Sequence, residues 1–296
     1  MILTVTANPM VEHLFKVPGF QSNRDFRPGR PAQVVATGKP INCARALQDL
    51  GHEVMCVAPV GGATGREIEE LLEREELPHR LVNIRAESRR GFTVYDELGQ
   101  VTTVYGPAPR LRDAEVDAIV ATVRSLLPAR MLVLGGSTSR PDLYARLVKL
   151  GLPVVLDTRG EALEQSLAAG GDILLAKPNL RECRETFGCL DVERAVHELR
   201  ARGAHNAVVT DGADEAVFVL GERSLRLRPP EVDVVHTVGC GDALCAGWIH
   251  AHDRPGPEAA AFAMACGSHA ASRPGVSRLS VRSCETLARQ ILESSS

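Results

Sequence analysis

The sequence predicts an α/β fold with a doubly wound, mostly parallel sheet that helices cover on both faces. Short apolar runs alternate with amphipathic stretches along most of the 296 residues. Strands that alternate with helices are typical of a parallel sheet with buried faces. Hydrophobic residues make up 44% of the chain and aromatic residues only 4%, so the core must be built mainly from aliphatic side chains. We expect one domain over residues 1–296.

The apolar runs are bounded by turn-forming residues and are typical of buried strands. They lie at residues 3–7, 53–58, 131–134, 154–156, 173–176 and 207–210. Helical spacing of apolar residues marks the stretches between them, at residues 41–50, 66–74, 113–127, 142–150 and 190–202. Open α/β sheets bind ligands at the carboxyl ends of their strands, so motifs at those ends are the first candidates for a functional site.

Two segments interrupt this alternation. Residues 12–35 contain three prolines and two glycines and show no helical period. Residues 91–105, G-F-T-V-Y-D-E-L-G-Q-V-T-T-V-Y, place β-branched and aromatic runs on both sides of a D-E-L-G turn, as in a hairpin. We expect both segments to form a small antiparallel flap, from about residues 10–36 and 88–106.

Charge and composition exclude several classes of function. The formal net charge is −3 and the isoelectric point is near 6.3, so no basic field indicates nucleic acid or an anionic membrane as a partner. No apolar run approaches the roughly 20 residues of a membrane span, and the N-terminus lacks the pattern of a signal peptide. The eight cysteines include no C-x-x-C pair and, Cys240 apart, are expected to be buried thiols. We expect a cytoplasmic protein with a small-molecule partner.

The segment T-V-G-C-G-D-A-L-C-A-G, at residues 237–247, is the strongest candidate for a functional motif. Gly239 and Gly241 permit backbone conformations that other residues resist. The amides of Gly239, Cys240 and Gly241 would form an anion cradle at a helix N-terminus. Asp242 stands in the first helical turn, where Asp is also favoured as a simple cap. An anion cradle beside a carboxylate suits phosphoryl transfer, because the amides bind the transferring group while the carboxylate takes the proton of the attacking hydroxyl.

A second Gly-rich turn, G-G-A-T-G at residues 61–65, follows a predicted strand and opens a helix, which is the context of a dinucleotide-binding loop. However, no acidic residue ends a second strand at the distance that such a site requires, and the first strand–helix turn of the chain lacks glycines. We therefore prefer a different interpretation to that of a nicotinamide site: the turn lets a ligand or the flap pass close to the backbone.

The segment at residues 237–247 resembles the D-T-x-G-A-G-D signature of the ribokinase-like (PfkB) carbohydrate kinases. Other segments resemble motifs of this family in the same order, namely T-G-K-P-I-N-C-A-R-A-L at residues 37–47, A-E-S-R at 86–89, L-D-T-R-G at 156–160, L-L-A-K-P-N-L-R-E at 174–182 and V-V-T-D-G-A-D at 208–214. The chain is most similar to the branch with 1-phosphofructokinase and tagatose-6-phosphate kinase. The resemblance implies the ribokinase-like fold and ATP-dependent phosphorylation of a hydroxyl on a small sugar phosphate, such as fructose 1-phosphate, fructose 6-phosphate or tagatose 6-phosphate.

The resemblance also implies roles for catalytic and cofactor-binding residues. Asp242 would be the general base, and Gly239, Cys240 and Gly241 would form the anion hole. ATP and its Mg²⁺ would be bound by Lys177, Asn179, Glu182, Thr210 and Gly212, with Mg²⁺ held by Asn179 and Glu182 largely through water. Magnesium keeps much of its hydration shell in proteins. Without the resemblance, Asn179 is more simply a helix cap and Glu182 part of a solvated helix face.

On the acceptor side, the residues implied are Glu12, Gly38, Lys39, Asn42 and Arg89. Gly38 would hold sugar hydroxyls through its backbone and Asn42 through its side chain. Arg89 would grip the phosphate of the substrate, because the planar guanidinium matches phosphate oxygens. Without the resemblance, Arg89 is a surface side chain beside Arg90. Lys39 would add positive charge.

The departures from the family pattern gather on this acceptor side. Glu12 replaces an aspartate that holds sugar hydroxyls and moves the carboxylate about one methylene outward. Thr37 and Pro40 replace the first and last glycines of G-G-K-G, and Gly91 replaces an asparagine. His236 stands where many members carry an aspartate that helps to bind a monovalent cation. Because an imidazole cannot replace that carboxylate, we expect weak or absent activation by potassium.

The expected function is therefore an active sugar-phosphate kinase that uses ATP and Mg²⁺ and forms a homodimer through its β-flap. Two alternatives stay open. One is a kinase of the same fold for an unphosphorylated sugar or a nucleoside, in which Arg89 would contribute little. The other is a non-catalytic regulatory protein that binds a sugar phosphate. Replacing Asp242 with Asn separates the alternatives, since only an enzyme would lose its rate.

Overall fold

The computed structural model describes residues 1–29 and 31–294, and its largest feature is a nine-stranded sheet. From one edge to the other its strands are β13 (Arg223–Leu227), β12 (Glu215–Leu220), β11 (Asn206–Asp211), β10 (Ile173–Ala176), β9 (Val154–Asp157), β8 (Met131–Gly135), β1 (Ile2–Thr6), β4 (Val54–Val60) and β5 (His79–Asn83). All pairs from β5 to β11 are parallel, and β12 and β13 add antiparallel pairs at one edge. The expected doubly wound, mostly parallel sheet is confirmed.

The strand order reverses at β1. The chain adds β4 and β5 on one side of β1 and then returns to place β8, β9, β10 and β11 on the other side. In open α/β sheets, ligands bind in the crevice at such a reversal, outside the carboxyl ends of the strands. The loops that follow Thr6 of β1 and Gly135 of β8 therefore mark the expected position of a site.

Helices cover both faces of this sheet, because successive residues of each buried strand point to opposite sides. One face packs against α1 (Lys39–Asp49), α2 (Gly62–Arg74), α8 (Cys240–Ala251), α9 (Gly256–Ala271) and α10 (Val281–Ser294). The other packs against α3 (Asp113–Ser125), α4 (Asp142–Val148), α5 (Gly160–Ala168), α6 (Leu180–Phe187) and α7 (Val192–Ala201). On β1, for example, Ile2 belongs to the first hydrophobic core and Leu3 to the second.

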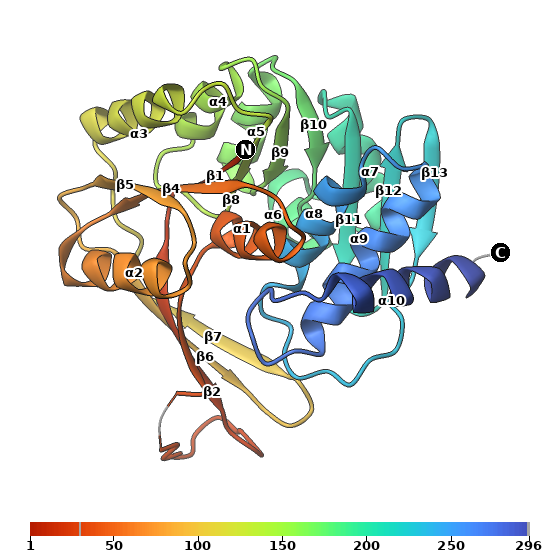
Figure 1. The fold of residues 1–296 in the computed structure, drawn as a ribbon, viewed down its shortest axis with the longest axis horizontal. Coiled ribbons are helices and arrows are strands. Elements are labelled where there is room, and N and C mark those ends of the chain that lie inside the picture. The colour runs from red at the N-terminus through yellow and green to blue at the C-terminus, as the bar shows by residue number, and fades with distance from the viewer. Residues whose placement is uncertain (30, 295–296) are drawn as a thin grey trace.

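A separate four-stranded sheet projects from the main body (Figure 1). Its strands, in order, are β3 (Gln33–Thr37), β2 (Met10–Lys16), β6 (Arg89–Tyr95) and β7 (Val101–Tyr105). The outer pairs are antiparallel, as expected, but the central pair of β2 and β6 is parallel. β2 follows β1 and β6 follows β5, and these two strands run in the same direction in the large sheet. The flap strands consequently leave the large sheet in the same direction.

Two further expectations concern composition. All eight cysteines are free thiols, and seven of them are buried, with Cys240 half-buried, so the expectation of structural thiols is confirmed. Within residues 1–29 and 31–294, no helix combines the length and the hydropathy that a membrane crossing requires.

Candidate active site

The turn that precedes α8 adopts the conformation that its first glycine permits. Gly239 has a φ of 80°, and a Cβ at this position would lie 2.2 Å from Ser277 Oγ, so any other residue would be strained and would clash. Gly241 lies within α8 and has no positive φ, and a Cβ there would lie 3.3 Å from Lys177 Nζ. The expectation of an unusual backbone conformation is therefore wrong for Gly241. Its missing side chain instead lets the Lys177 ammonium approach the helix.

The amides of this turn take part in the first bonds of α8. Cys240 N–H donates to Thr237 O over a long 3.4 Å, and Asp242 N–H donates to Gly239 O at 3.1 Å. The N-terminus of a helix carries partial positive charge and favours a bound anion. An anion hole formed by Gly239, Cys240 and Gly241 stays a prediction.

Four charges, three of them buried and that of Lys39 half-buried, form a network beside this turn. Lys39 Nζ lies 2.6 Å from Asp157 Oδ1 and 2.6 Å from Glu182 Oε1. Lys177 Nζ lies 3.2 Å from Asp157 Oδ2. Lys39 begins α1, while Asp157 ends β9 and Lys177 follows β10. The network thus lies at the carboxyl edge of the sheet, where its topology predicts a ligand.

Burial and ion pairing have opposite effects on the protonation of this network. Burial alone lowers the pKa of Lys39 and of Lys177, but the nearby carboxylates, Asp157 first among them, raise both above the ordinary lysine value. Burial likewise raises the pKa of Asp157, and the two ammonium groups outweigh this effect and lower it. All three groups are therefore charged at neutral pH.

Asp242 lies beside this network and is 7% exposed. Asn42 Nδ2 donates a hydrogen bond of 2.8 Å to its Oδ2. Burial, and after it the Asp157 carboxylate, raise the pKa of Asp242 to about 6, although the two lysines and the Asn42 hydrogen bond act in the opposite direction. A carboxylate with a pKa near neutrality is ionised and still accepts a proton readily, as general-base catalysis requires.

Asn179 and Glu182 form a reciprocal cap at the start of α6. Asn179 Oδ1 accepts from Glu182 N–H at 2.9 Å, and Glu182 Oε2 accepts from Asn179 N–H at 3.1 Å. Asn179 is thus a helix cap, but Glu182 is 8% exposed and faces Lys39, so it is not part of a solvated helix face. A parallel bridge joins Asn179 to Thr210. It brings the K-P-N segment beside the turn that carries Gly212, which has a φ of 59°.

The start of α1 is shaped by close contact with β1. Gly38 has a φ of 149°, and a Cβ there would lie 2.4 Å from Thr6 Cγ2, so a larger residue would push α1 away from the sheet. Pro40 stands in the first turn of α1, where helices tolerate a missing N–H. Thr37 Oγ1 donates to Asn42 Oδ1 at 3.0 Å. The departures at Thr37 and Pro40 therefore leave the helix start intact.

Glu12 lies on β2 at the inner face of the flap. It is 3% exposed and accepts a hydrogen bond from Thr93 Oγ1. Burial raises the pKa of Glu12, while its hydrogen bonds and Arg89 act against this rise. In the pairing of β2 with β6, Glu12 lies opposite Gly91. Glu12, which is longer than the aspartate of the family pattern, thus lies beside Gly91, which has no side chain. The departures at these two positions are therefore neighbours in the flap.

Arg89 begins β6 and is only loosely held by the protein. Its Nη2 donates to Asn8 O over 3.4 Å, and its guanidinium carbon lies 5.2 Å from the centre of the Tyr105 ring. Arg89 Nε and Asn8 Oδ1 are both buried, and neither has a hydrogen-bond partner among the described residues. Because buried polar atoms normally have partners, both atoms are placed to bind a polar ligand.

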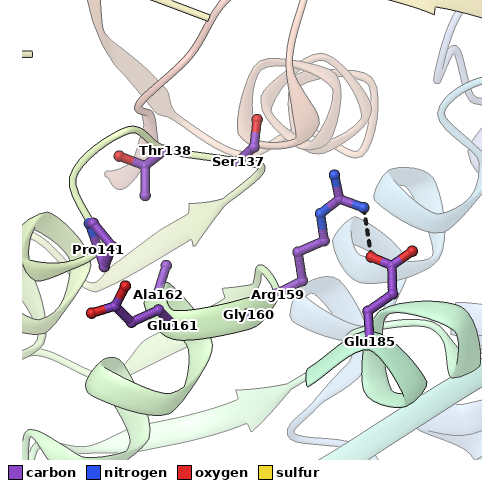
Figure 2. A pocket seen from close by; sticks show the side chains of 8 residues that line it. All are labelled: Ser137, Thr138, Pro141, Arg159, Gly160, Glu161, Ala162 and Glu185. Carbon is purple, nitrogen blue, oxygen red and sulfur yellow. Dashed lines mark hydrogen bonds and ion pairs between the residues drawn. The ribbon is translucent and has the colours of Figure 1, made fainter. Parts of the chain in front are cut away.

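A pocket of about 250 Å³ lies next to these residues, outside the carboxyl ends of β8 and β9 (Figure 2). Its lining comprises Ser137, Thr138, Pro141, Arg159, Gly160, Glu161, Ala162 and Glu185. An ion pair of 2.9 Å between Arg159 and Glu185 closes one side, as the dashed line in Figure 2 shows. Ser137 Oγ accepts a hydrogen bond of 3.1 Å from Asn8 Nδ2. The pocket is therefore joined through Asn8 to the surroundings of Arg89.

The structure thus brings Lys39, Asn42, Lys177, Glu182 and Asp242 together and places Glu12 and Arg89 in the adjoining flap. Sequence reasoning gave no role to Asp157, although this residue joins both lysines. Its signal is a single acidic residue at the end of an apolar strand, within L-D-T-R-G. Asn8 was missed for a similar reason, because a lone amide in a short loop has no spacing pattern.

Comparison with known proteins decides the family. Residues 16–283 match the pfkB family of carbohydrate kinases. The chain belongs to this family. It is 34% identical over 269 residues to a 1-phosphofructokinase of Rhodobacter capsulatus, with 84% of the chain and 83% of that protein covered. It is 27% identical over 262 residues to a tagatose-6-phosphate kinase of Staphylococcus epidermidis, covering 83% of the chain and 84% of that protein.

Solved structures agree with the family assignment. Phosphofructokinase-2 from Escherichia coli, in complex with potassium, superposes with a TM-score of 0.87 at 27% identity and 98% coverage of both chains. Ribokinase from Thermotoga maritima, at 20% identity and a TM-score of 0.77, supports the fold alone. The predictions of a ribokinase-like fold and of a PfkB carbohydrate kinase are confirmed, and this PfkB kinase uses ATP as the phosphoryl donor.

Proposed function

We propose that this PfkB kinase transfers the γ-phosphoryl group of ATP to a hydroxyl of a ketose phosphate. The observation that carries the proposal is Asp242, a buried carboxylate with a pKa of about 6 that stands at the N-terminus of α8 beside two ammonium groups, the buried Lys177 and the half-buried Lys39. The names of the relatives, 1-phosphofructokinase and tagatose-6-phosphate kinase, support a ketose phosphate as the acceptor.

In the proposed reaction Asp242 takes the proton of the acceptor hydroxyl as that oxygen attacks the γ-phosphorus in line. Asn42 binds one carboxylate oxygen, which leaves the other oxygen for the hydroxyl. The amides of Gly239, Cys240 and Gly241 stabilise the charge that develops on the transferring group. Lys177, next to Gly241, adds positive charge toward the nucleotide phosphates, while Thr210 and Gly212 line the nucleotide pocket.

The oxygen donors near Lys39 fit a magnesium ion. Mg²⁺ binds carboxylate and amide oxygens and retains several waters. Asp157 and Glu182 converge on the Lys39 ammonium, and Asn179 Oδ1 is engaged by a backbone N–H. The side-chain oxygens of Asn179 and Glu182 already accept hydrogen bonds from backbone N–H groups and from Lys39. These two residues would therefore hold the ion through its bound water molecules. When bound, Mg²⁺ neutralises phosphate charge during transfer.

The acceptor is proposed to lie between α1 and the flap. Gly38 and Asn42 would hold hydroxyls near the reacting end, with Glu12 on the flap side and Lys39 as a source of positive charge. Arg89 would bind the acceptor's own phosphate, since its Nε is buried without a partner and a guanidinium binds phosphate through two parallel N–H groups. The pocket beyond Asn8 provides space for this distal end.

The test is ADP release with Mg-ATP across free sugars, ketose phosphates and nucleosides, for wild type and for Asp242→Asn. Turnover on a ketose phosphate that Asp242→Asn abolishes, with the ligands still bound, supports the proposal. Turnover only on a free sugar or a nucleoside would keep the kinase and refute the phosphate site at Arg89. ATP binding without turnover on any acceptor would instead indicate a regulatory protein.

The same proposal includes a homodimer formed through the flap. Phe92 on β6 and Val104 on β7 are paired neighbours, and they are 48% and 65% exposed. His13 of β2 stacks on Phe92 with ring centres 5.4 Å apart. Phe92 and Val104 thus form an exposed apolar pair on two adjacent strands, and exposed apolar surface is typical of an interface. Light scattering of wild type and of Phe92→Ser would test it, and a monomeric wild type would refute it.

A further inference from the structure

Arg45 is a guanidinium enclosed in the main body of the protein. It lies on α1, one turn after Asn42, and is 2% exposed. Its Nε and Nη2 bind the two carboxylate oxygens of Glu75, which caps the end of α2, and Nη2 also donates to Ala36 O at 2.8 Å. The remaining nitrogen, Nη1, donates to Asn42 Oδ1 at 3.0 Å. A buried charge with this many partners is held in one orientation.

The bond from Arg45 decides which way the Asn42 amide points. Asn42 Oδ1 accepts from Arg45 Nη1 and from Thr37 Oγ1, each at 3.0 Å, so that Nδ2 faces Asp242. A hydroxyl both donates and accepts, and Thr37 therefore tolerates either orientation of the amide. A guanidinium only donates. With the amide reversed, Nδ2 would face Arg45, and Oδ1 would face the carboxylate of Asp242.

We propose that Arg45 is a positioning residue for phosphoryl transfer, which holds the Asn42 amide with its N–H group toward Asp242. This inference rests on the proposed function only in so far as Asp242 is the base. A donor to the carboxylate favours its ionised form, whereas an amide oxygen facing it would favour the protonated form. Arg45 thereby keeps Asp242 ionised and fixes the oxygen that is left for the acceptor hydroxyl.

The experiment compares Arg45→Met with a matched control, Glu75→Gln. Both variants break the same buried ion pair, but Glu75→Gln leaves the bond from Arg45 to Asn42 in place. The readouts are the pKa of Asp242, from the ¹³C shift of its carboxyl carbon assigned with Asp242→Asn, and the acid limb of the pH–rate profile. For Arg45→Met we expect the pKa to rise by about one unit and the rate at pH 7 to fall about twofold, because the ionised fraction of Asp242 falls by that factor. Glu75→Gln should lose thermal stability and keep the wild-type pKa.

Arg45→Lys covers the case in which Arg45→Met does not fold, because an ammonium also only donates. Arg45→Lys should return the pKa of Asp242 toward the wild-type value, and in an Asn42→Ala background the change from Arg to Lys should have no effect on that pKa. A wild-type pKa in Arg45→Met, or equal pKa shifts in Arg45→Met and Glu75→Gln, would refute the positioning role. The carboxyl titration needs no turnover, so a failure of the proposed function would be seen separately, in the acceptor panel.

Discussion

The charged groups around β9 and β10 are paired within the protein, whereas polar groups at the base of the flap have atoms without a hydrogen-bond partner. Lys39 and Lys177 share Asp157, Lys39 also binds Glu182, and Asn42 binds Asp242. At the flap, by contrast, Arg89 Nε and Asn8 Oδ1 are buried without partners in the described part of the chain. In the first region the charged groups have their partners without a ligand, so their geometry is set by the folding of the protein. In the proposed function a polar ligand binds to these atoms of the second region, which would make this region the place where the acceptor is selected.

The largest effect expected in the paired region is on the rate. Asp242→Asn should lower kcat by about 10²- to 10⁴-fold, the usual contribution of a general base, while KM for ATP stays near the wild-type value. In the wild-type enzyme kcat/KM should fall below about pH 6, the pKa of Asp242. Steady-state kinetics from pH 5 to pH 9 measure both effects. An acid limb that persists unchanged in Asp242→Asn would assign it to another group.

The same residue should oppose the stability of the fold. The pKa of Asp242 is raised from 3.8 to about 6 in the folded state, so the folded protein binds this proton more tightly than the unfolded chain. The cost of the buried charge is therefore present in full above pH 6 and disappears as pH falls below 4. Asp242→Asn should stabilise the protein at pH 8 by on the order of 3 kcal/mol and give little gain at pH 4. Urea unfolding at the two values of pH tests the difference.

Asp157→Asn should be the most destabilising change in the paired region. It removes the carboxylate that Lys39 and the buried Lys177 share, and an uncompensated buried charge costs about 3–5 kcal/mol. Asp253→Asn is the matched control, because Asp253 is 81% exposed and its ion pair with Arg130 spans 3.3 Å. We expect the control to change the free energy of unfolding by less than about 0.5 kcal/mol. Equal effects of the two substitutions on the free energy of unfolding would contradict the view that the ion pairs of Asp157 are buried and contribute to stability.

At the flap, substitutions should alter acceptor affinity with little effect on the fold. Arg89→Met should raise KM for a ketose phosphate by about 10- to 100-fold, the loss of charge-assisted hydrogen bonds worth about 1.5–3 kcal/mol. Thermal stability and KM for ATP should hardly change. Arg90→Met, which instead breaks an ion pair with Glu67 on α2, serves as the neighbouring control. Similar KM values for the two variants would place the acceptor phosphate elsewhere.

The smallest effect is expected from potassium. His236 is fully buried, and its Nε2 lies 3.0 Å from the carbonyl oxygen of Pro274. An imidazole in contact with this carbonyl provides no carboxylate for a cation. Titration with KCl at constant ionic strength, balanced with choline chloride, should show no several-fold activation. A clear rise in rate would show that a cation site persists without the carboxylate.

The sequence predicted the central strands well, because β1, β8, β9 and β10 are short, mostly apolar runs between turn residues. It did not predict β5, H-R-L-V-N, where only Val82 is buried and no apolar run exists. Nor did it predict α9, G-P-E-A-A-A-F-A-M-A-C-G-S-H-A-A, where every residue from Ala259 onward is buried. A helix enclosed on all sides has no polar face, so its apolar residues show no helical period.

The site was predictable where residues stand together in one motif and hidden where the fold assembles them. Gly239 and Asp242 are close neighbours in the chain, and the motif around them indicated the turn and the buried carboxylate at the start of α8. Asp157 meets Lys39 across 118 residues, and Asn42 meets Asp242 across 200. Such pairs depend on the order of strands in the sheet, which a single sequence does not reveal.

The contact of Asn42 with Asp242 also has a consequence for the order in which the site is assembled during synthesis. Chains leave the ribosome N-terminus first and a domain generally folds as a unit, and the residues of the flap strands and of α1 have all been synthesised by residue 105. The carboxylate arrives only with α8, which packs against α1. A nascent chain that ends before residue 240 therefore lacks the carboxylate that we propose as the base. Under the proposed mechanism, catalytic competence is acquired at the close of translation, when the last fifth of the polypeptide meets the first.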